Sequence, residues 1–525
     1  MGTRNVNCIL LKPVDTTEVS KILKEMKESS PGWDEIQAKI VKKTFISFIA
    51  PLTHICNLSI LKGCFPSELK LAKVVPIFKA DCRSTYTNYR PVSVLSCFSK
   101  LLETLMYDRL ISFIIQHELL YKYQFGFRKA HSTILAILTL TDMVSKALEN
   151  GNHVIGVFLD FSKAFDTVDH DILFHKLDHL GIRGTALDWL RDYLTSRHQF
   201  VMYDKISSDK KVVTCGVPQG SVLGPLLFLL YVNDIANISD TLFSILFADD
   251  TNALAIGKDL NVLIETVNKE LQKVVTWLAA NKLSLNIKKT HFMIFRTKNK
   301  NTKHSNPIKI GNEIINEVEH TKFLGVIIDN RLKWNFHVNL IKRKISKGFG
   351  VICKAKRLMK KETLVTLYYS FVYPYLQYGI IAWGSTYDNV INPIFRLQKK
   401  IVRVISSSRW HAPSDPIFKS LKLLPLYKIY ILNVMMFMYK IHFEMFPNIF
   451  GDMFVQNSEI HGYDTRQSNN YHVQIWHLEL VRRSIRIQGV HFWNLIQNQI
   501  NCYVTLVTFK YHVKKFLLEN DFNDN

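Results

Sequence analysis

Two adjacent carboxylates, Asp249 and Asp250, follow an apolar run in the segment FADDT, where a strand would be expected to enter the core. Like charges side by side repel each other unless a cation lies between them, and a hard divalent ion with oxygen ligands serves that purpose. A polar β-turn is the alternative, because Asp is common in turns. The pair therefore indicates either a metal site or a simple turn.

A third carboxylate, Asp160, ends the apolar run 154–159 in the segment FLDFSKAFDTVDH. This run predicts a buried strand, and the helical spacing of apolar residues that follows places Asp160 at the strand's exit. Asp160 and Asp249 could then share a pair of metal ions, which activate the attacking oxygen and stabilise the leaving oxygen in phosphoryl transfer. Asp166 and Asp169 precede the next helix, where capping is an alternative explanation.

A turn lies in the segment CGVPQGSVLGPLLF, directly before an apolar helix. Pro218 and Gly220 predict a backbone turn that can lie close against a nucleotide without side-chain obstruction. The alternative is an ordinary turn between a strand and a helix.

The elements that must position these residues are predicted from hydrophobic periodicity. Short strands are expected at 73–94, a buried strand at 154–159 and a hairpin formed by 245–248 and 253–256. Helices are expected at 15–30, 41–61, 99–118, 131–149 and 259–280. After about residue 330 the apolar spacing is helical without strong strand signals, so this half is predicted to be mostly α.

The chain carries a net charge of +23, from 67 Lys and Arg against 44 Asp and Glu. Such an excess favours a polyanionic partner, with nucleic acid as the first choice and a merely basic protein as the alternative. Between 331 and 410 there are 16 Lys and Arg against Glu362 and Asp388. Cations alternate with apolar residues at helical spacing in this region, which predicts helices that follow a phosphate backbone; a solvated helix face is the alternative.

The eight cysteines form no Cys-x-x-Cys pair and no zinc spacing, which favours free thiols in a reducing compartment. The N-terminus lacks the apolar core of a secretion signal, and the longest apolar run, 222–232, is too short to cross a bilayer. We therefore expect an intracellular protein, nuclear, cytoplasmic or both, that is neither secreted nor membrane-bound.

An ordered set of motifs resembles the palm of reverse transcriptases from non-LTR retrotransposons, particularly the LINE-type, jockey-like group. These motifs are FLDFSKAFDTVDH, GVPQGSVLGPLLFLLYVND, FADDT, WLAANKLSLNIKKT and HTKFLGVIID. Upstream, VVPIFKAD, NYRPVSVLSCFSKLLETLMYDRL and QFGFRKAHST resemble the finger motifs, and PGWDEIQAKIVKK resembles the leader before them. The resemblance covers about residues 29–440 and is specific as a set, whereas each motif alone is weak.

The resemblance implies an α+β right-hand polymerase with fingers, a palm on an antiparallel sheet and a helical thumb, followed by an α-rich C-terminal extension. We expect an N-terminal helical leader at 1–60 and fingers and palm at 61–329. A helical thumb is expected at 330–425, and an α-rich region of unknown role at 426–525.

Catalytic roles are implied for Asp160, Asp249 and Asp250. The metal ligands would be Asp160, Asp249 and the main-chain carbonyl of Phe161. Nucleotide-binding positions are implied at Lys79, Arg90, Phe165, Gln219 and Gly220. Among these, Phe165 matches the aromatic residue that excludes a ribose 2′-hydroxyl, and the two cations face the triphosphate.

Further positions match the family with their roles left open. Lys289 could protonate the leaving pyrophosphate, or it could be a solvated lysine after a helix. Three residues match the family's hairpin that seats the primer end: Phe323, Leu324 and Gly325. A buried hairpin turn would also explain them, and the two explanations are compatible. Arg128 could order the fingers or contact the template.

The implied activity is RNA-directed DNA polymerisation, in which a DNA 3′ end is extended on an RNA template from deoxynucleoside triphosphates. Mg²⁺ is the implied cofactor, with Mn²⁺ as a substitute. One alternative is a decayed or co-opted element protein that binds RNA without catalysis. Another is an RNA-dependent RNA polymerase, which the bulky Phe165 disfavours.

Full-length elements of this group usually carry an endonuclease before the polymerase, and we recognise no such segment here. We therefore expect a truncated or partial element product, with a separate endonuclease needed for integration.

Overall fold

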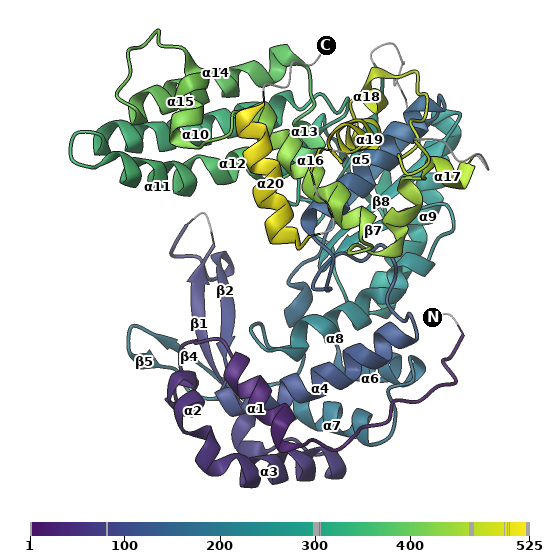
Figure 1. The fold of residues 1–525 in the computed structure, drawn as a ribbon. Coiled ribbons are helices and arrows are strands. Elements are labelled where there is room, and N and C mark those ends of the chain that lie inside the picture. Colours follow the sequence, from purple (N-terminus) through teal and green to yellow (C-terminus); the bar gives the residue numbers. More distant parts are fainter. Residues whose placement is uncertain are drawn as a thin grey trace.

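The computed structural model describes residues 3–79, 82–297, 304, 306–460, 467–497, 499–500, 502 and 504–520. Helices and several small sheets alternate along this part of the chain, so the predicted α+β class is confirmed. Figure 1 shows the N-terminal helices in a lower lobe and the C-terminal helices in an upper one, with strands in both.

A central sheet, antiparallel except for one parallel edge pair, connects the two lobes. Its strand order is β12 (Asn316–Glu317), β9 (His291–Phe295), β3 (His153–Asp160), β8 (Asp250–Gly257) and β7 (Phe243–Phe247). The middle strand β3 pairs antiparallel with both β8 and β9. The buried strand and the acidic hairpin predicted from the sequence are therefore confirmed.

Both faces of β3 are covered, which explains its continuous apolar run. Val154 and Phe158 belong to one hydrophobic core, together with α5 (Thr133–Glu149). Ile155 and Val157 point to the opposite face and join a second core. Successive residues of a strand point to opposite faces, so one strand can contribute to two cores.

Helices line the second core and extend into the lower lobe. They are α4 (Cys97–Gln116), α6 (His170–His179), α7 (Thr185–Leu194), α8 (Leu223–Val232) and α9 (Leu260–Ala280). Trp189 and Tyr193 of α7 stack at the base of this core, with ring centroids 5.5 Å apart.

A second sheet stands in the lower lobe (Figure 1). It contains β2 (Tyr89–Val94), β1 (Leu71–Phe78), β4 (Arg197–Tyr203), β5 (Ile206–Ser207) and β6 (Lys211–Val213). The strands β1 and β2 form an antiparallel hairpin, as the sequence predicted, and β1 runs parallel to β4.

The helices before this sheet are α1 (Thr16–Glu25), α2 (Ala38–Thr44) and α3 (Ile49–Lys62). The prediction of one helix at 41–61 is wrong, because a short 3₁₀ segment, Phe45–Phe48, separates α2 from α3. Pro51 explains the break, since its ring would clash with the carbonyl four residues earlier in a continuous helix.

The stretch Ala38–Lys62 is long and apolar enough, by length and composition, to cross a membrane, with 28% of its most apolar window buried. Lysines and other polar residues interrupt the apolar residues of this stretch, so the sequence shows no continuous apolar run there. Its exposed face carries Ile46, Ile55 and Leu61.

The described chain beyond β12 adds the hairpin β13 (His320–Phe323) and β14 (Val326–Asp329), and then only helices, as predicted. The first are α10 (Asn335–Ala355), α11 (Lys361–Phe371), α12 (Tyr373–Gln377), α13 (Ile380–Trp383), α14 (Asp388–Ile405) and α15 (Ser414–Leu421). They are followed by α16 (Leu426–His442), α17 (Asn457–Ile460), α18 (Glu479–Arg482), α19 (Ile485–Ile496) and α20 (Leu506–Glu519). A small hairpin, β10 (Lys309–Ile310) and β11 (Glu313–Ile314), precedes β12.

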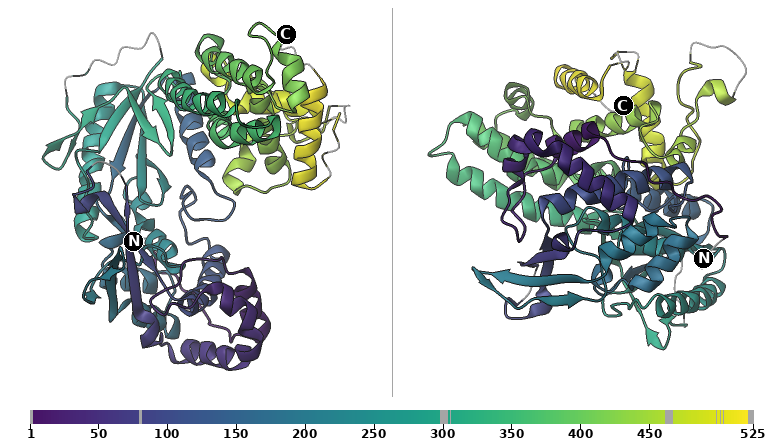
Figure 2. Two further views of the ribbon diagram at one scale, coloured as in Figure 1. Left: turned by 90° about the vertical axis from the view of Figure 1, so that its left-hand side faces the viewer. Right: turned by 90° about the horizontal axis from the view of Figure 1, so that it is seen from below.

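Helix α18 packs on α5, which in turn packs on β3 and β7 of the central sheet, and α19 and α20 pack on α16. Figure 2 shows these C-terminal helices, coloured green to yellow, together on one side of the sheet. The Arg486 guanidinium pairs with the Asp142 carboxylate through two nitrogens. The Glu149 carboxylate accepts hydrogen bonds from the backbone N–H groups of His477 and Leu478. This C-terminal region therefore shares one core with the back of the central sheet.

Candidate active site

Three carboxylates lie at one end of the central sheet. Asp160 is the last residue of β3, and it is paired in register with Asp250, the first residue of β8. Asp249 lies in the two-residue turn that joins β7 to β8. The antiparallel pairing of neighbouring strands therefore brings residues 90 positions apart to one edge.

The surroundings of Asp249 and Asp250 disfavour their ionised forms. Burial raises the pKa of Asp249, and repulsion from Asp160 raises it further, while Arg90 and Lys79 oppose the rise. Burial, and then repulsion from Asp249 and Asp160, raise the pKa of Asp250 to about 6. Asp249 and Asp250 nevertheless keep exposed surface, so their desolvation is partial. Such a group favours binding of a cation, which relieves the repulsion.

The turn that carries Asp249 is held by a residue that the sequence analysis missed, Gln124. Its side-chain oxygen accepts hydrogen bonds from the backbone N–H groups of Gly126, at 2.9 Å, and Ala248, at 3.1 Å. A Cβ on Gly126 would lie 2.4 Å from the Ala248 nitrogen, so only glycine permits this approach. Gln124 is 1% exposed, and buried amides need hydrogen-bond partners. The available sequence signal was a glutamine among the aromatic residues and the glycine of the QFGF segment.

Asp160 is held by the segment that follows α9. The backbone N–H of Asn286 donates to the Asp160 carbonyl at 2.8 Å, and the Asp160 N–H donates to the Thr290 hydroxyl at 3.3 Å. The Lys289 ammonium lies 3.9 Å from the Asp160 carboxylate and is 63% exposed. Lys289 is thus beside the carboxylates, and its role as an acid stays a prediction.

Phe165 is fixed between two other aromatic rings. Its ring stacks on Phe228, with centroids 4.3 Å apart, and Phe127 meets it edge-on at 6.3 Å. The backbone N–H of Val217 donates to the Phe165 carbonyl at 2.9 Å. The predicted sugar-contacting residue and the predicted nucleotide turn are therefore directly connected.

The turn at 218–222 packs closely against β2. The backbone N–H of Ser93 donates to the Gln219 carbonyl at 2.7 Å. Gly220 has φ +121°, and a Cβ there would lie 2.5 Å from the Ser93 carbonyl oxygen. The glycine is therefore required both by the backbone conformation and by the contact.

Asp166 has a role that capping does not explain. Its carboxylate accepts a hydrogen bond of 2.7 Å from the Gln219 side-chain amide, and burial raises its pKa. Asp169, in contrast, is the predicted cap: it accepts from the Ile172 N–H at 3.0 Å and pairs with Lys282 at 2.6 Å. Asp166 therefore sets the direction of the Gln219 side chain.

The β1–β2 hairpin brings two cations toward the carboxylates. Arg90 pairs in register with Ile77, and the Lys79 backbone N–H donates to the Asn88 carbonyl at 2.8 Å. Both side chains are exposed, and both charges lower the pKa of Asp249.

Residues 77–328, which contain these elements, match the family described as reverse transcriptase (RNA-dependent DNA polymerase). They form a reverse transcriptase domain.

The chain is similar to three proteins of Drosophila melanogaster. It is 28% identical over 428 residues to the probable RNA-directed DNA polymerase from transposon BS, covering 79% of this chain and 47% of that protein. It is 27% identical over 423 residues to the probable RNA-directed DNA polymerase from transposon X-element, covering 79% and 46%. It is 27% identical over 426 residues to the RNA-directed DNA polymerase from mobile element jockey, and this alignment covers 78% of this chain and 46% of that protein.

The chain spans less than half the length of these curated relatives. The resemblance to the jockey-like group of non-LTR retrotransposons is confirmed.

Arg128 of the reverse transcriptase domain binds backbone rather than pointing freely outward. Its guanidinium donates to the carbonyls of Tyr121, at 2.9 Å, and Gln124, at 3.1 Å. Of the two roles considered for Arg128, this contact favours the ordering of the segment that carries Gln124.

The hairpin β13–β14 lies against the central sheet of the domain. Phe323 is 3% exposed, and its ring centroid is 6.4 Å from that of Phe158 in β3. Leu324 and Gly325 form the turn with φ values of 44° and 87°. The Tyr378 hydroxyl donates to the Leu324 carbonyl. The turn is thus held by the helical half of the chain.

The donor set suits a metal that also binds substrate. Within the described ranges, no group of three or more His, Cys, Asp or Glu side chains forms a complete site by itself. Asp160 and Asp249 offer two carboxylates, and no described residue donates a hydrogen bond to the Phe161 carbonyl. Mg²⁺ is commonly bound by one or two carboxylates together with substrate phosphates, so these residues fit such an ion.

Proposed function

We propose that the chain is an RNA-directed DNA polymerase of a non-LTR retrotransposon, which extends a DNA 3′ end on an RNA template from deoxynucleoside triphosphates. The observation that carries the proposal is the meeting of Asp160 and Asp249 at one edge of the sheet, beside the turn that holds Gln219. Two acids at that edge are what metal-assisted nucleotidyl transfer requires.

We assign the lobes as a right hand. The helices α1 to α3 are the N-terminal leader, the second sheet belongs to the fingers, and the central sheet is the palm. The helices from α10 to α15 are the thumb, and those from α16 onward are the C-terminal extension. This assignment corresponds to divisions at 1–60, 61–329, 330–425 and 426–525.

Asp160, Asp249 and the Phe161 carbonyl would hold Mg²⁺, with Mn²⁺ as a substitute. When bound, such ions supply activation of the primer 3′ oxygen and stabilisation of the charge on the phosphate. Asp250 adds negative charge beside this set. Burial and the two neighbouring carboxylates raise its pKa to about 6, which is still below neutral pH, so Asp250 is largely ionised there.

The other residues would bind and orient the nucleotide. Lys79 and Arg90 face the triphosphate, where fixed cations stabilise the charge that develops during transfer. Phe165 excludes the 2′-hydroxyl, and Gln219 and Gly220 lie along the incoming nucleotide. Lys289 donates a proton to the leaving pyrophosphate from its Nζ atom.

The turn of β13–β14, with Phe323, Leu324 and Gly325, would seat the primer end. We also propose an intracellular location, nuclear, cytoplasmic or both, without membrane attachment. A separate endonuclease would supply the nicked target for integration.

Primer extension on poly(rA) with an oligo(dT) primer tests the proposal. Asp160→Asn and Asp249→Asn should each abolish extension and leave nucleic-acid binding nearly unchanged, because the amide removes a charged ligand at constant size. Asp204→Asn is the matched control, since Asp204 lies in an exposed turn at φ 47°, which Asn adopts readily.

Reactions with Mg²⁺, Mn²⁺ and EDTA complete the test. Full extension by either active-site variant would refute the metal assignment. RNA binding by the wild-type protein without extension in any metal would favour the decayed or co-opted RNA-binding protein.

A further inference from the structure

Aromatic and cationic side chains alternate on the outer surface of α14 and the segments beside it. The Lys399 ammonium lies 4.2 Å from the Phe395 ring centroid, and the Lys400 ammonium lies 5.0 Å from that of Trp410. Tyr427 meets Phe395 edge-on at 6.0 Å. Trp410 is 55% exposed and Tyr427 is 37% exposed. We call these five residues the α14 surface.

The segment 391–422, which contains four of the five residues of the α14 surface, is almost entirely positive in charge. Between residues 391 and 422 there is one acid, Asp415, against seven cations. These are Arg396, Lys399, Lys400, Arg403, Arg409, Lys419 and Lys422. A patch of one sign attracts a polyanion, and exposed rings among the cations offer stacking platforms for unpaired bases.

The α14 surface is held in place by buried contacts. Gln398, which is fully buried, donates to the Tyr368 hydroxyl and the Leu424 carbonyl, each at 2.9 Å, and accepts from the Leu426 N–H at 2.8 Å. The Arg403 guanidinium donates to the Ala412 carbonyl at 2.8 Å and fixes the loop that carries Trp410. Bases would therefore meet a surface that is already ordered, which lowers the entropy cost of binding.

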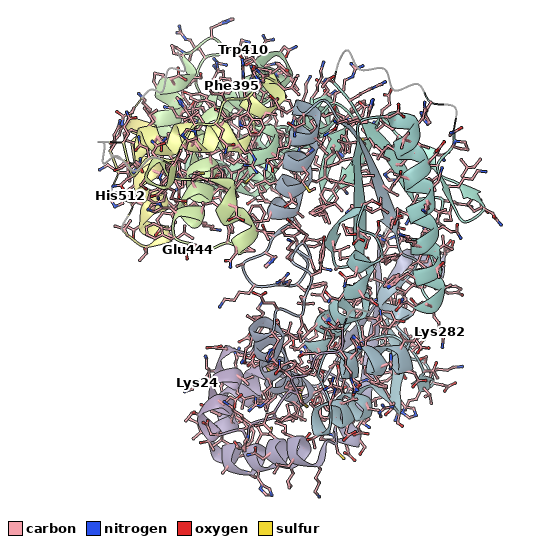
Figure 3. The ribbon with its side chains drawn as sticks, turned by 90° about the vertical axis from the view of Figure 1, so that its right-hand side faces the viewer. Lys24, Lys282, Phe395, Trp410, Glu444 and His512 are labelled. Atoms are coloured by element: carbon pink, nitrogen blue, oxygen red, sulfur yellow. The ribbon has the colours of Figure 1, made fainter. Side chains whose placement is uncertain are left out.

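The α14 surface lies away from the catalytic carboxylates. Figure 3 shows Phe395 and Trp410 at the end of the upper lobe farthest from the lower lobe, which carries Lys24. In Figure 1, α10 and α11 lie between α14 and the β1–β2 hairpin. The cations of α14 are therefore placed to bind nucleic acid outside the space between fingers and thumb.

We propose that the α14 surface binds single-stranded RNA, namely the part of the template that is not in the catalytic site. Bases would stack on Trp410 and Tyr427, and phosphates would pair with Lys399 and Lys400. The choice of RNA rests on the proposed function, because in that reaction the primer is paired along its template and the template is the long unpaired strand.

Binding measurements without catalysis test the proposal. Fluorescence anisotropy would compare one primer–template duplex with a long single-stranded 5′ RNA overhang and the same duplex without it. Trp410→Ala should weaken binding of the overhang duplex roughly tenfold, since stacking contributes about 1–3 kcal/mol per base. Lys400→Glu should weaken it similarly and reduce the salt dependence, because fewer counterions are released. Binding of the duplex without the overhang should not change.

Lys24→Glu is the matched charge control, because Lys24 is an exposed lysine of α1 in the lower lobe (Figure 3). An equal loss of overhang binding with Lys24→Glu would overturn the proposal in favour of general charge attraction. Unchanged binding by Trp410→Ala, with a native unfolding curve, would also overturn it. A larger effect of Trp410→Ala on a DNA overhang than on an RNA overhang would overturn the choice of RNA.

The primer-extension assay separates this site from the proposed function. A wild-type protein that does not extend primers, but binds the overhang through Trp410 and Lys400, would refute the polymerase and support the α14 surface. Normal primer extension, with overhang binding that neither substitution changes, would support the polymerase and refute the α14 surface.

Discussion

Replacing Gly220 with alanine is expected to damage nucleotide use by moving one turn. The added Cβ would lie 2.5 Å from the Ser93 carbonyl oxygen, whereas ordinary contacts begin at 3.4 Å, so the turn and β2 must separate by about 0.9 Å. A displacement of about 1 Å at a positioned group can cost on the order of a hundredfold in rate. The φ of +121° adds strain of roughly 1–3 kcal/mol for any residue with a Cβ.

The assay is steady-state primer extension at varied deoxynucleotide concentration, combined with chemical denaturation. Because Gln219 precedes the altered residue and bonds to Asp166, kcat/KM for the nucleotide should fall about a hundredfold. Binding of the primer–template duplex should change little. The fall in stability is expected to exceed that of the control.

Gly184→Ala is that control, since Gly184 also has a positive φ, +57°, and no described atom lies within 4 Å of its added Cβ. It should lose stability through strain alone and keep its nucleotide kinetics. The reasoning about the turn is refuted if Gly220→Ala and Gly184→Ala give the same kcat/KM for the nucleotide.

Three further outcomes are expected. Phe165→Val should admit ribonucleotides, because the ring held against Phe228 is removed. Competition between ribo- and deoxynucleotides measures this, and unchanged sugar selection would exclude a role of Phe165 in rejecting the 2′-hydroxyl. Tyr378→Phe should weaken duplex binding roughly fivefold, because it removes the hydrogen bond to the Leu324 carbonyl. Tyr375→Phe, the same change on an equally exposed tyrosine, should leave duplex binding unchanged. Equal affinities of the two variants in an anisotropy titration would contradict this. Burial lowers the pKa of His337 to about 4 from 6.5, so the unfolded chain binds the proton first, and stability should fall by up to roughly 3 kcal/mol as the pH drops from 6.5 to 4. In urea titrations across this range, His337→Asn should lose less stability than the wild type, and parallel curves would show that another group is responsible.

Much of the carboxylate site at the end of the central sheet could be predicted, because its sequence signals are local. An apolar run that ends on Asp160, and a hairpin that turns at Asp249, are patterns within a few residues of the chain. The alternation of the β3 side chains between two cores follows from strand geometry alone. The same local reasoning failed at 41–61, where helical spacing outweighed the single Pro51 that breaks the helix.

The C-terminal region shows where local patterns stop being informative. Its helices were predicted from spacing, but their docking on α5 was not. The ion pair between Arg486 and Asp142 joins residues 344 positions apart. A charged residue in a sequence does not specify its partner, since many arrangements satisfy the same charge.

By itself, the sequence determined which residues end strands, which segments are helical and which family the motifs resemble, because these depend on neighbours in the chain. Only the tertiary structure decided that Gln124 supports the turn before Asp249, that Asp166 orients Gln219, and that Phe395 and Trp410 lie at the end of the upper lobe farthest from the lower lobe. The physical reason is that a side chain's partners are chosen by packing between segments far apart in sequence, which no local periodicity encodes.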